Sequence, residues 1–174
     1  YPIYLGLGIA TQAFELPCKK QVLVCDDHIK TLYAHQFFQL VDLNLSIVPG
    51  EGSKTREVKH ELEDSMLAQA CDRQTMLYAL GGGVVTDLTG YLASSYYRGI
   101  DWTVIPTSLL AMVDSSIGGK TAVNTPWGKN LIGHFYFPKS VWIDVNFLKT
   151  LPESEFSNGM AEVIKHAALF DKEY

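Results

Sequence analysis

The chain has 174 residues, of which 47% are hydrophobic and 19% charged, a composition that excludes a disordered protein and fits one folded domain, or one domain and part of a second. Its 14 basic and 19 acidic side chains give a formal charge of −5, which excludes nucleic-acid binding driven by bulk charge. No apolar run approaches the ~20 residues that span a bilayer, and the three widely spaced cysteines and the absence of a basic leader segment predict a cytoplasmic protein without disulfides.

The first half of the chain alternates strand and helix patterns. Apolar runs at 21–25, 43–48 and 76–80 predict three strands, and helical spacing follows each of the first two. Thr55 is a plausible N-cap of the second helix. The apolar stripe of that helix recurs every four residues, at Val58, Leu62, Met66 and Ala70. This alternation predicts a Rossmann-like α/β fold, with a mostly parallel sheet flanked by helices.

The second half is less regular, but it continues the same alternation. Its predicted elements are, in order, a helix at 84–96, a strand at 102–105, a helix at 107–113, a turn at 115–119, a strand at 142–144 and a helix from 151 onward. The last helix has no stop signal before Tyr174, from which we expect that the natural chain continues.

Three consecutive glycines, Gly81, Gly82 and Gly83, stand between a strand and a helix. Such a junction points free backbone N–H groups at one spot, where the helix dipole adds positive charge, so an anion binds well. The spacing is not the G-x-G-x-x-G of dinucleotide-binding loops, so phosphate binding and a tight structural turn both stay open. Residues 75–150 hold nine of the 14 glycines and a net charge of +1, which favours a phosphorylated ligand in this part of the chain.

Charged residues follow the first two strands. Asp26 could accept hydrogen bonds from a ribose diol, but capping of the next helix by Asp26 or Asp27 is the interpretation that the sequence alone favours. Glu51 and Lys54 could reach a ribose or an adenine, and a solvated charged loop is the simpler alternative.

The stretch from Asp114 to Asn124 contains Gly-Gly-Lys-Thr, but it lacks the first glycine of a phosphate-binding P-loop, and we exclude an ATPase. Arg98, Lys120 and Lys129 lie among loop glycines, which favours an anionic substrate. On the last helix, Glu162 and His166 share a face and could jointly hold a metal, although a surface ion pair is the commoner outcome of this spacing.

Residues 81–166 resemble the 3-dehydroquinate synthase family of sugar-phosphate cyclases. The matching motifs occur in the family's order, at 81–87, 97–99, 106–111, 113–116, 118–124, 128–130, 142–144, 148–152 and 159–165. Residues 1–80 match more loosely, mainly through the strand order and the Pro-Gly-Glu-x-x-Lys loop at 49–54. Thr86 and Ser108 stand where the family usually has glycine and threonine.

The resemblance implies an NAD-binding domain over 1–150 and the start of a mainly helical metal and substrate domain over 151–174. It assigns to NAD the residues Asp26, Glu51, Lys54, Gly82, Gly83, Asp87, Thr107, Ser108, Lys129, Thr150 and Glu155. It assigns to the substrate Arg98, Asp114, Lys120, Asn130 and Lys165. Glu162 would be the first ligand of Zn²⁺ or Co²⁺, whereas His166 has no metal role in the family.

The implied activity is that of 3-dehydroquinate synthase, a lyase of the shikimate pathway and so of aromatic amino acid biosynthesis. It converts 3-deoxy-D-arabino-heptulosonate 7-phosphate to 3-dehydroquinate and phosphate, and NAD is regenerated in each turnover. The family also implies a homodimer, a small sugar-phosphate substrate, and neither nucleic acid nor membrane as partner.

Three alternatives stay open. The chain could belong to another cyclase of the superfamily, or, more remotely, to the polyol dehydrogenases, which are not expected to keep the loop at 118–124. It could also be a truncated NAD-binding module without activity, because the family takes its two histidine metal ligands from beyond Tyr174. We therefore expect the 174-residue chain alone to be inactive.

Overall fold

The computed structural model describes residues 1–170. Six strands form one sheet in the order β1-β8-β5-β4-β2-β3, and all of its pairs are parallel. These strands are β1 (Ile3–Gly6), β2 (Lys20–Asp26), β3 (Leu43–Ile47), β4 (Thr75–Gly81), β5 (Trp102–Pro106) and β8 (Ser140–Asp144). The predicted Rossmann-like sheet is thereby confirmed.

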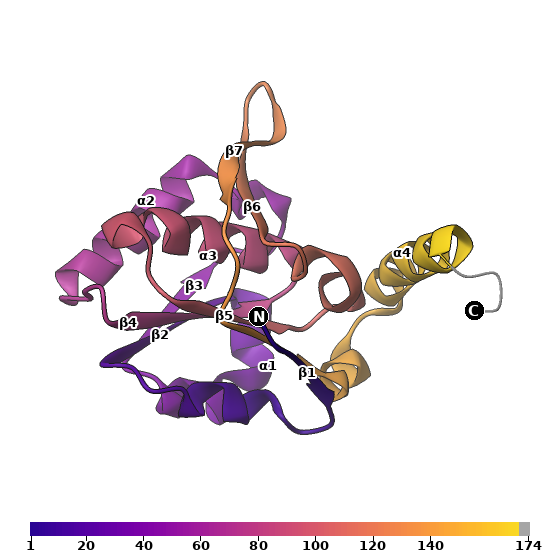
Figure 1. Cartoon of the computed structure of the whole chain (residues 1–174), viewed down its shortest axis with the longest axis horizontal. Helices are drawn as coiled ribbons and strands as arrows, with labels where there is room; N and C mark the ends of the chain where they lie inside the picture. Colours follow the sequence, from indigo (N-terminus) through magenta and orange to yellow (C-terminus); the bar gives the residue numbers. More distant parts are fainter. Residues whose placement is uncertain (171–174) are drawn as a thin grey trace.

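Helices cover both faces of the sheet. The α-helices are α1 (Asp27–Phe37), α2 (Arg56–Ala68), α3 (Gly83–Ser95) and α4 (Glu153–Phe170). Shorter helical turns are η1 (Ala10–Glu15), η2 (Phe38–Leu40), η3 (Glu51–Ser53), η4 (Tyr96–Arg98), η5 (Ala111–Ser115) and η6 (Val145–Thr150). In Figure 1, α1 lies on one face, while α2 and α3 lie on the other. Among the described helices, none has the length and apolar character needed to cross a membrane.

The core is built on interior strands of the sheet, among them β4 and β2. Every residue of β4 is buried, as are Val22, Leu23, Val24 and Cys25 of β2. A parallel strand covered on both faces needs a continuous apolar run rather than an alternating one. The three cysteines of the chain are free thiols.

The chain reverses its direction of winding between β2 and β4. These neighbouring strands pair up to Cys25 and Leu80, but β2 is followed by α1 on one face and β4 by α3 on the other. Ligands of open parallel sheets bind at such a point, outside the carboxyl ends of the strands. Asp26 and Gly81 end these two strands, so the fold places both of them at this crevice.

A β-hairpin, β6 (Lys120–Thr125) with β7 (Gly128–Phe135), extends beyond α3 (Figure 1). The sequence patterns predict no strand over these residues, whereas in the structure Lys120 begins one. The hairpin escapes prediction because most of β7 is exposed and lacks an apolar face. Its two strands approach so closely that a Cβ on Gly133 would lie 1.9 Å from the carbonyl oxygen of Thr121.

Two helix predictions also need correction. The segment predicted as a helix at 107–113 contains a wider π-helical turn, η5, which runs to Ser115. Helix α2 ends at Ala68, and Ala70, predicted on its apolar stripe, has a positive φ of 53° outside the helix. Thr55 caps α2 as predicted, since its side chain accepts the N–H of Val58. The predicted continuation of α4 over 171–174 lies outside the described residues.

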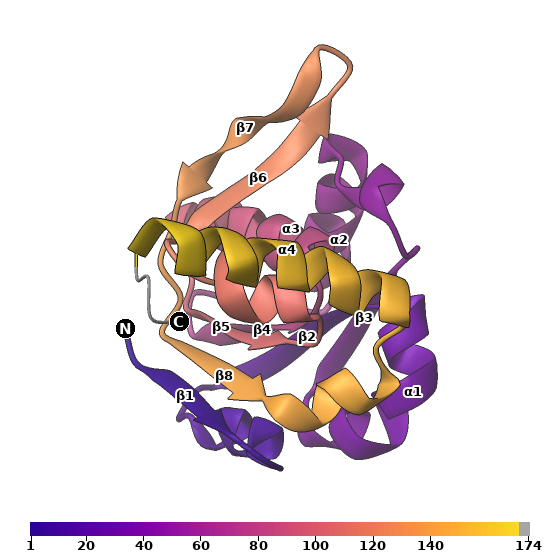
Figure 2. The same cartoon turned by 90° about the vertical axis from the view of Figure 1, so that its right-hand side faces the viewer.

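Gly159 sets how closely α4 approaches η5. Figure 2 shows α4 crossing the carboxyl edge of the sheet, and a Cβ on Gly159 would lie 2.6 Å from Cβ of Leu109 and 2.7 Å from the backbone nitrogen of Leu110. Gly159→Ala should gain about 1 kcal/mol of helix propensity but lose about 1–3 kcal/mol through overpacking.

We therefore expect Gly159→Ala to lower the free energy of unfolding, measured by urea denaturation. The control is Asn158→Ala on the exposed neighbouring position, which should be neutral or slightly stabilising. An increase of stability for Gly159→Ala would show that α4 does not depend on this close contact.

Candidate active site

Two cavities lie at the carboxyl edge of the sheet. The first, which we call the sheet-edge cavity, has a volume of about 160 Å³. Its lining includes six residues that the sequence analysis assigned to NAD, namely Asp26, Gly82, Thr107, Ser108, Thr150 and Glu155. Asp26 ends β2, Gly82 follows β4, Thr107 and Ser108 follow β5, and the other two lie in η6 and α4, so the sheet edge gathers residues from across the chain.

Two of these residues are held by hydrogen bonds within the protein. Oδ1 of Asp26 accepts the N–H of Ile29 at 2.8 Å, which confirms the predicted helix cap, and Asp26 also lines the cavity. The hydroxyls of Thr150 and Tyr33 lie 2.6 Å apart and join η6 to α1. Tyr33 also lines this cavity and was not predicted as a site residue.

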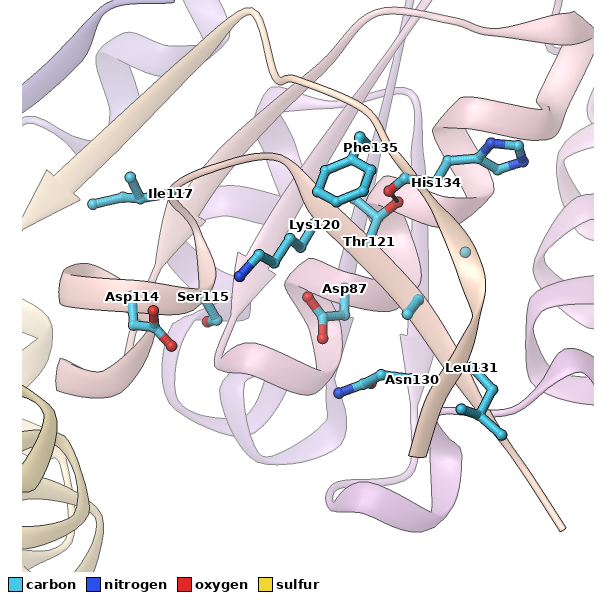
Figure 3. Close-up of a pocket in the computed structure, with 12 residues that line it drawn as sticks. Asp87, Asp114, Ser115, Ile117, Lys120, Thr121, Asn130, Leu131, His134 and Phe135 are labelled. Atoms are coloured by element: carbon cyan, nitrogen blue, oxygen red, sulfur yellow. Dashed lines mark hydrogen bonds between the residues drawn. The ribbon is translucent and has the colours of Figure 1, made fainter. Parts of the chain in front are cut away.

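The second cavity, the hairpin cavity, lies between α3, η5 and the hairpin and measures about 410 Å³. Three predicted substrate residues, Asp114, Lys120 and Asn130, line it together with Asp87 (Figure 3). Ser115 lines it as well, and its Oγ is buried without a hydrogen-bond partner among the described residues. Ser115 was not predicted as a site residue, although it follows Asp114 directly within a motif.

The N-terminus of α3 separates the two cavities. A Cβ on Gly82 would lie 3.3 Å from Oγ of Ser108, in the sheet-edge cavity, and a Cβ on Gly83 would lie 3.3 Å from Oγ of Ser115, in the hairpin cavity. Gly82 is the N-cap and offers no side chain to the first N–H groups of the helix. No acidic residue stands in the first turn, so these N–H groups and the helix dipole remain suited to an anion.

Thr86 shows how the chain accommodates its departure from the family pattern. The hydroxyl of this buried residue donates to the carbonyl oxygen of Gly83 at 3.0 Å, within its own helix. The extra side chain is thereby satisfied locally, and Thr86 lines neither cavity.

A charged network borders the hairpin cavity. Lys54 is 4% exposed, pairs with Asp87, and donates to Oδ1 of Asn130 at 2.6 Å. Burial raises the pKa of Asp87, and the ammonium of Lys54 opposes that shift. Glu51 accepts from Nδ2 of Asn124 at 2.7 Å, and Nζ of Lys129 lies 3.9 Å from it. The predicted cofactor residues of this group therefore lie beside a predicted substrate residue and do not line the sheet-edge cavity.

A possible metal-ligand group joins α4 to η5. One ligand atom each of Asp114, Glu162 and His166 lie within 4.8 Å of one another. Nε2 of His166 is 3.3 Å from Oε1 of Glu162, as the i,i+4 spacing predicted. Lys165 hydrogen-bonds to Glu162 and holds the pKa of that carboxyl below its usual range, so Glu162 is ionised as a metal ligand must be.

Two predicted substrate residues line neither cavity. Arg98 is exposed at the far end of α3, with a positive φ of 65°. Lys165 pairs with Glu162 on α4. Neither lines a cavity, and their substrate roles stay predictions.

Comparison with known proteins gives one family and several similar structures. A family model described as 3-dehydroquinate synthase N-terminal matches residues 44–158. A structure of 2-deoxy-scyllo-inosose synthase superposes with a TM-score of 0.88 at 28% identity, over 99% of this chain and 51% of that one. A second structure of 2-deoxy-scyllo-inosose synthase, complexed with carbaglucose-6-phosphate, NAD⁺ and Co²⁺, superposes with a TM-score of 0.85 at 29% identity. The match covers 94% of this chain and 47% of that one.

A third similar structure is ValA, the 2-epi-5-epi-valiolone synthase from Streptomyces hygroscopicus subsp. jinggangensis 5008, with NAD⁺ and Zn²⁺ bound. It superposes with a TM-score of 0.84 at 31% identity, over 95% of this chain and 48% of that one. The chain thus spans about half the length of these solved structures.

Proposed function

Because the chain belongs to the 3-dehydroquinate synthase family, we propose that it is the NAD-binding part of a sugar-phosphate cyclase. The proposed reaction converts 3-deoxy-D-arabino-heptulosonate 7-phosphate to 3-dehydroquinate and phosphate. Residues 1–150 form the proposed cofactor domain, and residues 151–174 begin a helical second domain. The exposed apolar residues Ile164, Leu169 and Phe170 of α4 support a further domain packed against this helix. We call the chain together with such a domain the complete enzyme.

The observation that carries the proposal is the helix N-terminus between two cavities. The bare N–H groups of Gly82 and Gly83 suit a pyrophosphate, and a side chain at either position would narrow the space beside them. The sheet-edge cavity leads from this point to Asp26, a carboxylate placed to accept ribose hydroxyls. The donors and shape of this edge therefore fit a dinucleotide such as NAD.

The hairpin cavity supplies the chemistry expected for a sugar phosphate. Lys120 brings a positive charge that would stabilise the phosphate and the charge developing on the carbon skeleton. Asp114 and Asn130 offer oxygens and an amide that would orient hydroxyl groups. The unpartnered hydroxyl of Ser115 is a further donor for a substrate oxygen.

Glu162 fits a divalent metal. Carboxylate oxygens are ligands of Zn²⁺ and Co²⁺, and a carboxylate oxygen of Glu162 lies within 4.8 Å of one of Asp114. When bound, NAD supplies hydride transfer at a ring carbinol, and the metal supplies Lewis-acid polarisation of its oxygen. In this proposal Glu162 holds the metal and His166 does not.

A second candidate is the cyclisation of a different sugar phosphate. The solved structures that support it are inosose and valiolone synthases, at 28–31% identity. Side-by-side assays of the complete enzyme separate the two candidates, with the heptulosonate phosphate and glucose 6-phosphate as substrates and phosphate release as the readout. Phosphate release from glucose 6-phosphate alone would favour the second candidate. The absence of turnover with NAD still bound would favour a binding module without activity.

NAD binding is tested by calorimetry, and we expect saturable heat. Asp26→Asn keeps the helix cap, because Asn and Asp cap equally well, but it removes the charged acceptor for ribose hydroxyls. This variant should weaken NAD binding by about tenfold, the value of one hydrogen bond to a charged group.

The matched control for this substitution is Asp27→Asn, on the exposed neighbouring residue, which should bind NAD as the wild type does. The cofactor assignment is contradicted if the wild type shows no saturable heat at about 1 mM NAD. Equal affinities for the two variants would leave NAD in place and remove Asp26 from its site.

A further inference from the structure

The hairpin β6–β7 carries a bulge where it meets the loop after β3. Val123 pairs with Ile132 and Thr125 pairs with Gly128, so Asn124 alone faces residues 129–131. Bulges re-aim the side chains of the longer strand and occur next to active sites. Asn130, inside this bulge, has a positive φ of 58°, and its side chain accepts from Lys54.

Asn124 contacts three members of the charged network at once. Its backbone N–H donates to the carbonyl oxygen of Lys54 at 2.7 Å, and its Nδ2 donates to Oε1 of Glu51 at 2.7 Å. Its Oδ1 accepts the backbone N–H of Asn130 at 3.1 Å. A side-chain amide offers a donor and an acceptor together, whereas a carboxylate offers acceptors only.

We propose that Asn124 is a positioning residue that fixes Glu51 and Lys54, on the cofactor side, relative to Asn130, on the substrate side. The inference rests on the proposed function and keeps the assignment that the family resemblance implies, with Glu51 and Lys54 at NAD and Asn130 at the sugar phosphate. Asn124 acts through these neighbours, and its side-chain amide joins Glu51 to the backbone of Asn130, beside the direct hydrogen bond from Lys54 to Asn130.

The proposal is tested with Asn124→Asp in the complete enzyme. The substitution keeps the acceptor for the N–H of Asn130 but sets a second carboxylate against Glu51. Repulsion then moves the loop away from the bulge. We expect the affinity for NAD, measured by calorimetry, and kcat each to fall by about tenfold or more.

A double variant exchanges donor and acceptor. With Glu51→Gln added to Asn124→Asp, the introduced amide donates to the introduced carboxylate and rejoins the loop to the hairpin. We expect kcat to recover relative to Asn124→Asp, while NAD affinity stays low because the carboxylate of Glu51 is absent. A general loss of fold stability would not separate kcat from NAD affinity in this way.

The matched control is Thr125→Ala, since within residues 1–170 the hydroxyl of Thr125 bonds only in the hairpin turn, to Gly128 and Trp127. It should leave both quantities unchanged. Three outcomes would each overturn the positioning role but not the proposed function. They are wild-type NAD affinity and kcat in Asn124→Asp, an equal loss of both in Thr125→Ala, and no recovery of kcat in the double variant. A wild-type protein that binds no NAD would overturn the proposed function and this inference with it.

Discussion

Replacing Lys120 by alanine should lower the kcat of the complete enzyme by about a thousandfold, the loss typical of one preorganised group that stabilises developing charge. Among the described residues that line the hairpin cavity, Lys120 is the only lysine or arginine, and Figure 3 shows its side chain between Asp114 and Asp87. NAD affinity should stay normal, because Lys120 does not line the sheet-edge cavity. Steady-state kinetics and calorimetry with NAD measure the two effects separately.

The control for this substitution is Lys139→Ala. Lys139 forms an exposed ion pair with Asp101, outside both cavities. Exposed ion pairs contribute little to the stability of a fold. This variant should turn over as the wild type does. A Lys120→Ala enzyme with normal kcat would remove Lys120 from the substrate site, and a selective loss of NAD affinity would move it to the cofactor side.

Replacing Lys54 by methionine should destabilise the chain by about 3 kcal/mol and weaken NAD binding. The ammonium of Lys54 is buried against Asp87, and removal of one partner of a buried pair leaves the other charge uncompensated. Oδ1 of Asn130 loses its donor in the same step. Urea denaturation measures the stability, and calorimetry measures the NAD affinity.

The stability loss should depend on pH. Burial raises the pKa of Asp87 in the folded state, and without Lys54 it rises further, since that ammonium lowers it. A carboxyl group whose pKa is higher in the folded than in the unfolded state contributes to stability when the pH is below its unfolded-state pKa. This contribution is lost as the pH rises through the folded-state pKa. The deficit of Lys54→Met relative to the wild type should therefore be small in acid, where Asp87 is protonated, and reach its full size at neutral pH.

Lys59→Met is the matched control for Lys54→Met. Lys59 is a second buried lysine, 7% exposed, and it pairs with Glu63 on α2, away from both cavities. Its replacement should also lower stability, but NAD affinity should not change. If both variants bind NAD normally, Lys54 serves the fold alone.

The local elements of the fold could be predicted from the amino-acid sequence. The apolar runs of β2 and β4, the caps at Asp26 and Thr55, and the glycines that open α3 were all predictable, because each depends on a few neighbouring residues. The order of the motifs along the chain also indicated the family. Capping and a ligand contact were alternatives for Asp26 in the sequence, and the structure shows that one side chain can cap α1 and line a cavity together.

The contacts between distant segments could be seen only in the folded structure. The pairing of β1 with β8 and the approach of Asn130 to Lys54 and of Glu162 to Asp114 join residues tens of positions apart. No local pattern encodes these meetings, because they follow from the sheet order and from how closely helices and the hairpin pack upon it. Gly159 allows one such approach, and the atoms that it avoids belong to Leu109 and Leu110, in a distant segment of the chain.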